Sequence, residues 1–240
     1  MKALRALPQA LNGRNRPVRN VLLKQIYFTG FESVGLILVV AMAIGTVIIT
    51  QIIGLVGSGN EVLIGKVLIW TVVRELGPLL TALIVIARSG AAIATELGTM
   101  QVGGEVESLE ILGIRPEVYL VMPRIVGLTI SLLVLTVYFE IGAILGGFLV
   151  ASLGWQVSFA PFAEGVYAAF SFAEILVSTS KSLPFGLLIS STCCGQGLSV
   201  SASPTQIPEA ATRGVLQSLF LVVAADVVVT LLSQLLNFQR

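Results

Sequence analysis

Long apolar segments alternate with short polar ones along this chain. Residues 33–60 hold 28 consecutive positions without a charge, and a helix needs only about 20 apolar residues to cross a bilayer. By length and apolar content the sequence predicts five membrane-spanning helices, over residues 33–56, 67–98, 119–151, 170–198 and 214–238. No internal repeat or linker is visible, so we expect an all-α membrane protein with one domain over residues 1–240.

The segment before the first span has a weak amphipathic pattern. Its apolar positions alternate with polar ones: Val18, Val21, Leu22 and Ile26 against Arg19, Lys24 and Gln25. This pattern predicts an interfacial helix over about residues 12–31 that lies in the membrane surface. A basic flank that only follows the charge rule is an equally good interpretation.

A short polar segment separates the second and third spans, and it is too polar to lie inside the bilayer. The sequence predicts a surface helix of about three turns over residues 105–115, because Gly113 suits a left-handed helix end and Pro116 blocks continuation. Val106, Leu109 and Leu112 form an apolar stripe on this helix, and Glu107 and Glu110 lie on its other faces. Such a helix suits docking by a soluble partner.

Lysine and arginine placement predicts the orientation in the membrane. Six basic residues precede the first span: Lys2, Arg5, Arg14, Arg16, Arg19 and Lys24. The loop over residues 152–167 has no lysine or arginine. The positive-inside rule then places the N-terminus in the cytoplasm. With five spans, the surface helix and the loop over residues 199–212 also face the cytoplasm, and the C-terminus faces out.

Composition agrees with a membrane class and excludes several others. Hydrophobic residues make up 55% and charged residues 11% of the chain, against about 25% charged in soluble domains. The net charge of +1 gives no basic footprint for nucleic acid. There is no histidine, and the adjacent Cys193 and Cys194 lack the spacing of a metal site, so we expect no cofactor in this chain.

The chain has no means of its own to use ATP. The nearest approach to a phosphate-binding loop, Gly65-Lys66, lacks the glycine five residues earlier and the Ser or Thr that follows the lysine. An odd number of spans without duplication also disfavours a self-contained secondary transporter. A partner protein or a second copy is therefore implied.

Five ionisable residues fall inside predicted spans, where each is costly unless it has a partner or a watery cavity: Arg74, Glu75, Glu140, Lys181 and Asp226. Glu140 lies close to several glycines, and for it a structural tie between helices is as good an interpretation as a functional one. For the other four we favour function. Arg88 and Glu96 are better interpreted as interfacial anchors.

Several segments together resemble the MlaE/YrbE family of ABC-transporter permeases. They occur in family order and cover nearly the whole chain: Gln25–Glu32, Arg74–Pro78, Ala87–Met100, Leu112–Pro116, Pro123–Arg124, Lys181–Ser182, Ala211–Gly214 and Asp226. The loop Gly195–Pro204 departs from the family's usual glycine-rich stretch.

The resemblance implies a non-catalytic, homodimeric permease of the inner membrane that moves phospholipid or related lipids between membranes. It also implies a separate ATPase, which would hold ATP and magnesium, and an MCE-domain partner in the periplasm. The surface helix would then be the coupling helix. Its expected ATPase contacts are Val106, Glu107, Leu109, Glu110, Leu112 and Arg115.

A lipid headgroup is charged, so a route for it benefits from fixed charges of both signs. We therefore expect a route lined by Arg74, Glu75, Lys181 and Asp226. The structural alternative pairs Arg74 with Glu75 and Lys181 with Asp226 only to tie helices together. Two other classes of function also remain open, namely a membrane scaffold and an oligomeric ion-coupled carrier.

Overall fold

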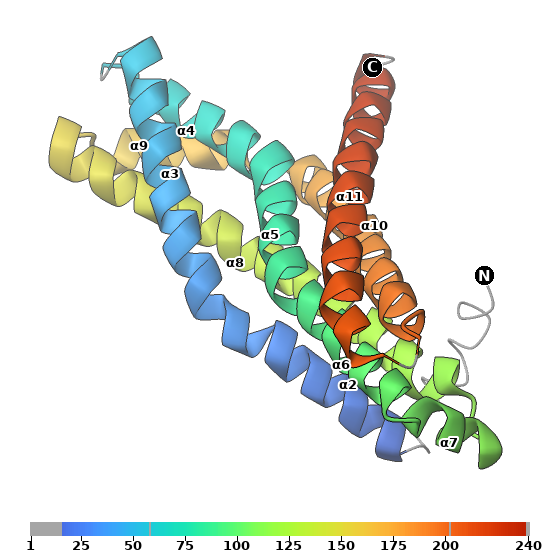
Figure 1. Ribbon diagram of the computed structural model, residues 1–240. Helices are drawn as coiled ribbons and strands as arrows, with labels where there is room; N and C mark the ends of the chain where they lie inside the picture. Colours follow the sequence, from blue (N-terminus) through green and yellow to red (C-terminus); the bar gives the residue numbers. More distant parts are fainter. Residues whose placement is uncertain (1–15, 58, 202, 239–240) are drawn as a thin grey trace. The chain divides into compact units, whose positions relative to one another are not determined.

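The structure, a computed structural model, describes residues 16–57, 59–201 and 203–238, and all secondary structure in these residues is helical (Figure 1). The α-helices are α2 (Arg16–Thr29), α3 (Val34–Val56), α4 (Glu61–Ile69), α5 (Gly77–Val85), α6 (Ala91–Val102), α7 (Glu105–Ile111), α8 (Met122–Trp155), α9 (Phe159–Ala169), α10 (Phe172–Leu198) and α11 (Ile207–Phe238). Short 3₁₀ and π segments connect or interrupt them: η2 (Phe31–Ser33), η3 (Trp70–Leu76), η4 (Ile86–Gly90), η5 (Glu117–Val121) and η6 (Pro204–Gln206).

Five helical runs are long and apolar enough to cross a membrane, as the sequence predicts. They extend over Val18–Val56, Glu61–Val102, Glu117–Trp155, Phe172–Leu198 and Pro204–Leu235. For the described residues, the predictions of an all-α fold and of five helices able to span a membrane are confirmed. Part of the predicted interfacial helix, residues 12–15, lies outside the described residues, and the surface placement of α2 stays a prediction.

Two features of the runs were not predicted. The second run contains two π segments, η3 and η4, which apolar periodicity does not reveal, because a π segment keeps the same residue types. In addition, the predicted loop over residues 152–167 contains most of helix α9. The aromatic residues of α9 suggest a headgroup layer, yet Phe162 and Ala169 are buried at helical spacing.

Residue contacts divide the chain into two compact units. Among the described residues, unit 1 comprises 16–32, 82–132 and 183–238 without residue 202, and unit 2 comprises 33–81 without residue 58, and 133–182. Three of the four boundaries fall inside α5, α8 and α10 and not in linkers. The single domain expected over residues 1–240 stays a prediction.

Unit 2 is held together by close helix approaches at glycine. A Cβ atom on Gly146 of α8 would lie 2.5 Å from Met42 Cα of α3, and one on Gly65 of α4 would lie 2.6 Å from the Phe162 carbonyl oxygen of α9. Thr46 Oγ1 also donates a hydrogen bond to the Gly146 carbonyl at 3.4 Å. Small residues let backbones touch in this way where lipid supplies no hydrophobic drive for association.

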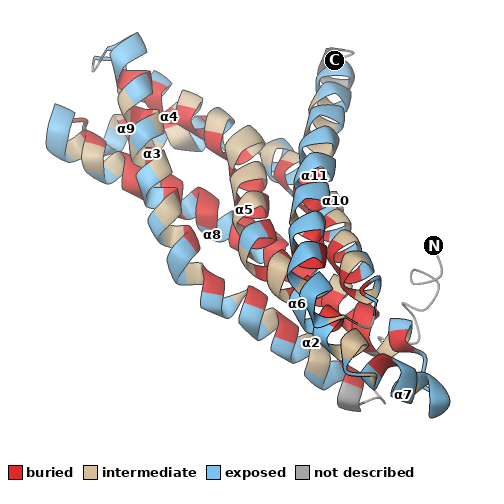
Figure 2. Cartoon of the chain, in the orientation of Figure 1, coloured by how far each residue is buried: buried red, intermediate tan, exposed pale blue. Residues whose placement is uncertain are grey.

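Unit 1 packs α6 against α10 and α11. A Cβ on Gly197 would lie 2.7 Å from the Ala94 carbonyl oxygen, and one on Gly214 would lie 3.6 Å from Cys193 Cα. By contrast, most large apolar side chains of α11 are exposed, as the pale blue of this helix in Figure 2 shows. An apolar face of this kind on a spanning helix is suited to contact with lipid or with a second copy.

Candidate functional site

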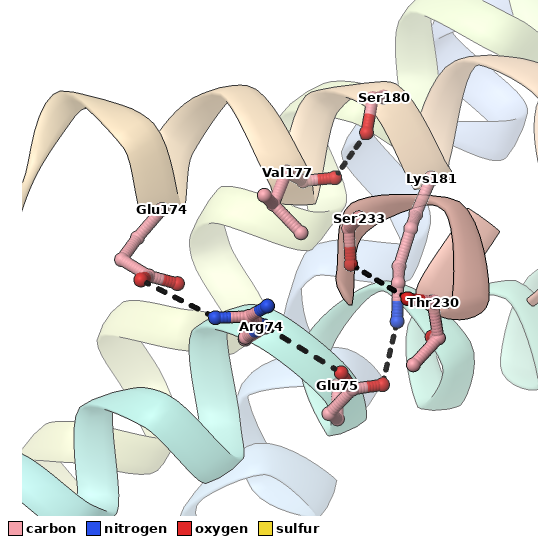
Figure 3. A network of polar contacts seen from close by, with 8 residues as sticks. All are labelled: Arg74, Glu75, Glu174, Val177, Ser180, Lys181, Thr230 and Ser233. Carbon is pink, nitrogen blue, oxygen red and sulfur yellow. Dashed lines mark hydrogen bonds and ion pairs between the residues drawn. The ribbon is translucent and has the colours of Figure 1, made fainter. Parts of the chain in front are cut away.

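Four charged side chains of unit 2 form a connected network between η3 and α10 (Figure 3). Lys181 Nζ donates to Glu75 Oε2 at 2.6 Å. The Arg74 guanidinium lies 3.9 Å from Glu75 and 3.9 Å from Glu174. Two cations and two carboxylates therefore alternate along one chain of contacts.

Burial makes this network energetically important. The Lys181 side chain is 0% exposed and Glu174 is 12% exposed, whereas Arg74 and Glu75 are 25% and 38% exposed. Transfer of an ammonium group out of water costs several kcal/mol unless a carboxylate compensates it. Glu75 supplies that compensation for Lys181, and its own partial exposure opens the network on one side.

Local helix geometry explains how the four residues meet. Glu174 and Lys181 are seven residues apart on α10, which is close to two turns, so they share one helix face. Arg74 and Glu75 are neighbours in sequence and both lie in the π segment η3. Such segments are frequent at functional sites because they reorient side chains within a helix.

The structure brings together three of the four residues expected to line a lipid route, namely Arg74, Glu75 and Lys181. It adds Glu174, which sequence reasoning missed because this residue lies in the first turn of the fourth span. Its position seven residues before Lys181 was the available signal. Asp226 is half-buried on α11 in unit 1, and its expected pairing with Lys181 stays a prediction.

Glu140 connects helices within unit 2. Its Oε1 accepts a 2.6 Å hydrogen bond from Ser178 Oγ of α10, and a Cβ on Gly77 would lie only 3.0 Å from its Cγ. The contacts support the structural interpretation of Glu140. A role for it in lipid transport stays a prediction.

The predicted surface helix is shorter in the structure, since α7 ends at Ile111 and not at residue 115. Gly113 has φ +74°, and the Gly113 N–H donates to the Glu110 carbonyl at 2.9 Å while the Ile114 N–H donates to that of Leu109 at 2.9 Å. This pair of bonds is the Schellman motif that closes a helix at glycine. The glycine therefore ends the helix earlier than Pro116 would.

The apolar stripe expected on α7 is divided between two surroundings. Val106 is 8% exposed and packs into the chain, whereas Leu112 is 73% exposed and its neighbour Ile111 is 80% exposed. Glu107, Glu110 and Arg115 are exposed. Val106 therefore does not share the exposed surface on which Leu112 lies, and its expected contact with the ATPase stays a prediction.

The segments that carried the family resemblance in unit 1 contact one another through arginine. Arg88 Nη2 donates to Glu32 Oε2 at 2.9 Å, and the Arg88 guanidinium lies 5.2 Å from the Phe28 ring centroid. Arg124 forms an ion pair with Glu96 at 3.1 Å. These contacts join η2 and α2 to η4, and α8 to α6.

Known proteins are similar to this chain over most of its length. The family model described as "Permease MlaE" matches residues 22–232. A Synechocystis protein named "Probable ABC transporter permease protein" is 32% identical over 211 residues, or 87% of this chain and 79% of that protein. A Rickettsia typhi protein of the same designation is 28% identical over 88% of this chain and 82% of its own length.

A chloroplast protein of Arabidopsis thaliana, "Protein TRIGALACTOSYLDIACYLGLYCEROL 1", is 29% identical over 95% of this chain and 63% of its own length. The family match and these relatives include all five apolar runs in part or in full. The chain therefore belongs to the MlaE family of ABC-transporter permeases and is a multi-pass membrane protein.

Proposed function

We propose that this permease moves phospholipid or a related lipid between membranes. The observation that carries the proposal is the balanced charge network of unit 2, with a fully buried Lys181 paired to a partly exposed Glu75. The name of the Arabidopsis relative, which is that of a glycolipid, supports a lipid substrate.

In the proposed mechanism, the network exchanges partners with the lipid headgroup. Arg74 and Lys181 bind the phosphate, because guanidinium and ammonium groups form charge-assisted hydrogen bonds to phosphate oxygens. Glu75 and Glu174 hold the two cations while no lipid is present, which limits the penalty of an uncompensated buried charge. Asp226 is the further acid that we expect beside this route.

Energy for transport comes from outside the chain. Membership of an ABC permease family implies an ATPase partner, and we assign its contact to exposed residues of α7 and of the segment that follows it, namely Glu107, Glu110, Leu112 and Arg115. A second copy of the chain and a periplasmic MCE-domain protein complete the proposed assembly. The proposed location is the inner membrane, with the N-terminus cytoplasmic and the C-terminus periplasmic.

Reconstitution tests the function directly. The purified permease alone should hydrolyse no ATP, and its addition to vesicles together with the ATPase should give ATP-dependent transfer of a fluorescent phospholipid. A membrane scaffold would give no transfer under any condition. An ion-coupled carrier would give transfer that follows a proton gradient without ATP, and either result would overturn the proposal.

The coupling role of α7 has its own test. The double variant Glu107→Lys/Glu110→Lys should lose co-purification with the ATPase, because it reverses the charge of the exposed acidic flank. Glu164→Lys, on the exposed surface of α9 in unit 2, is the control and should retain the partner. Full ATPase binding and transport by the double variant would rule out the assignment.

The divided stripe sharpens this test. Leu112→Ser should weaken ATPase binding with little change in thermal stability, because Leu112 is 73% exposed. Val106→Ser should instead lower the melting temperature of the permease, because it places a hydroxyl where an 8% exposed side chain packs. If Val106→Ser weakened ATPase binding and Leu112→Ser lowered the melting temperature, Val106 would belong to the docking face and Leu112 would not.

A further inference from the structure

Unit 1 has a pocket with charged residues in its lining that the proposed transport network does not use. It has a volume of about 260 Å³, and residues of α2, α6 and α8 line it, among them Lys24, Glu96 and Arg124 on the polar side. Gln25, whose Nε2 donates to Thr29 Oγ1, and the apolar Val21, Phe28 and Ala92 complete the lining. The pocket therefore has a charged side and an apolar side.

Arg124 is the fixed cation of this pocket. Its side chain is 4% exposed, its Nη1 donates to the Leu120 carbonyl oxygen at 3.0 Å, and its Nη2 lies 3.1 Å from Glu96 Oε2. A guanidinium group has five N–H donors in a planar fork that matches phosphate geometry. The two contacts hold the group in place and leave further donors for a ligand in the pocket.

The pocket has more positive than negative charge. Glu96 is 50% exposed and faces Arg124, whereas Lys24 is exposed and forms no ion pair with any residue that the structure describes. Two cations thus share one carboxylate. An anion with one net charge would neutralise the pocket.

The surroundings of the pocket indicate where such an anion would come from. Helix α2 exposes aromatic side chains, and the rings of Tyr27 and Phe31 stack with centroids 5.4 Å apart. Aromatic residues next to basic ones are typical of the headgroup layer of a membrane. Basic pockets between helices on the cytoplasmic side are known sites for anionic headgroups.

We infer that this pocket binds the phosphate of an anionic lipid headgroup from the surrounding membrane, at a site separate from the transport network. Arg124 and Lys24 contact the phosphate, and the upper part of the acyl chains lies against Val21, Phe28 and Ala92. The bound lipid joins α2 to α6 and α8. The inference depends on the proposed placement of α2 at the membrane surface and not on the identity of the transported lipid.

The test measures lipid binding to the full-length chain. Delipidated protein in detergent is titrated with phosphatidylglycerol or with phosphatidylcholine of the same acyl chains, and bound lipid is counted by native mass spectrometry. Wild type should prefer phosphatidylglycerol. Lys24→Gln should weaken phosphatidylglycerol binding about fivefold, which corresponds to the roughly 1 kcal/mol that one basic residue contributes near anionic lipid.

Two further variants make the result specific. Arg19→Gln removes a charge from the exposed side of the same helix but outside the pocket, and it should retain the preference of wild type. Glu96→Gln keeps an oxygen that can accept from Arg124 but removes the negative charge, so phosphatidylglycerol binding should become tighter.

Three outcomes would overturn the inference. The first is equal binding of the two lipids by wild type. The second is an equal loss of binding in Lys24→Gln and Arg19→Gln, which would show a general surface charge effect. The third is tight binding of inorganic phosphate, added as a separate arm, without any preference for phosphatidylglycerol, which would identify a free-anion site.

Discussion

Both units contain buried cations, but their charges are connected differently: four charges form one network in unit 2, whereas Arg88 and Arg124 of unit 1 form separate pairs with Glu32 and Glu96. In unit 2, Lys181 is 0% exposed and the more distant acid Glu174 is 12% exposed. In unit 1, the acids that pair with arginine are half-open to solvent, with Glu96 at 50% and Glu32 at 40%. Water and salt therefore screen Glu32 and Glu96 more than Glu174, whereas Glu75, at 38%, is about as exposed as Glu32.

This difference indicates what each cluster does. A buried pair loses several kcal/mol when one partner is removed, because the other charge remains without compensation, whereas exposed pairs contribute about 0–1 kcal/mol. Unit 1 uses its arginines to join η2 and α2 to η4, and α8 to α6. The helices of unit 2 already pack closely at their glycines. Its charge network is therefore more than helix packing requires.

The largest expected effect is that of Lys181→Met. It removes the buried cation at similar size, and Glu75 then has no ammonium group at 2.6 Å. We expect ATP-driven lipid transfer to fall about tenfold or more, while the partial exposure of Glu75 keeps the stability cost below the about 3–5 kcal/mol of a fully buried pair. Vesicle transfer assays and thermal unfolding in detergent measure the two quantities.

Lys66→Met is the matched control, since Lys66 lies on α4 in the same unit but outside the network. Its transfer rate should equal that of wild type. A similar loss in both variants would remove the special status of Lys181.

Glu174→Gln should have a smaller effect. Arg74 retains Glu75 at 3.9 Å after the change, so we expect transfer to fall only a few-fold and the apparent affinity for anionic lipid to rise. Glu164→Gln, at an exposed position of α9, is the control and should leave transfer unchanged. No change in either variant would exclude Glu174 from the network's function.

The smallest expected effect is that of Arg88→Gln in unit 1. Its pair with Glu32 is partly exposed, and it contacts Phe28 through a cation–π interaction and a 3.3 Å hydrogen bond from Nη1 to the carbonyl oxygen. Together these contacts contribute about 1–3 kcal/mol. Thermal stability should decrease slightly and transfer per folded molecule should not change. If Arg88→Gln lost as much transfer as Lys181→Met, the assignment of transport to the charge network of unit 2 alone would be wrong.

Apolar segment length sufficed to predict the five spans, because the bilayer requires about 20 apolar residues of each helix. The π segments η3 and η4 and the buried side of α9 were beyond that argument, since they depend on which residues of other helices lie alongside. Gly113 predicted the type of helix end at α7 correctly. It did not predict that Leu112 would be exposed and Val106 buried.

For the candidate site, the cost of charge in hydrocarbon identified Arg74, Glu75 and Lys181 without any structure. The partner of Lys181 was not predictable in this way. Any acid in the spans could compensate its charge, and only the packing of η3 on α10 within unit 2 selects Glu75. Glu174 was missed because it lies near the end of the fourth span. Its distance from that end does not show that it shares a helix face with Lys181.

The central claim is that the Glu75–Lys181 pair serves lipid transport and does more than tie helices together. The double variant Glu75→Gln/Lys181→Met tests it most directly, because it removes both charges and leaves neither without compensation. We predict that thermal stability recovers relative to Lys181→Met while ATP-driven lipid transfer stays at the level of that single variant. Recovery of transfer together with stability would contradict the claim and show that the pair is only structural.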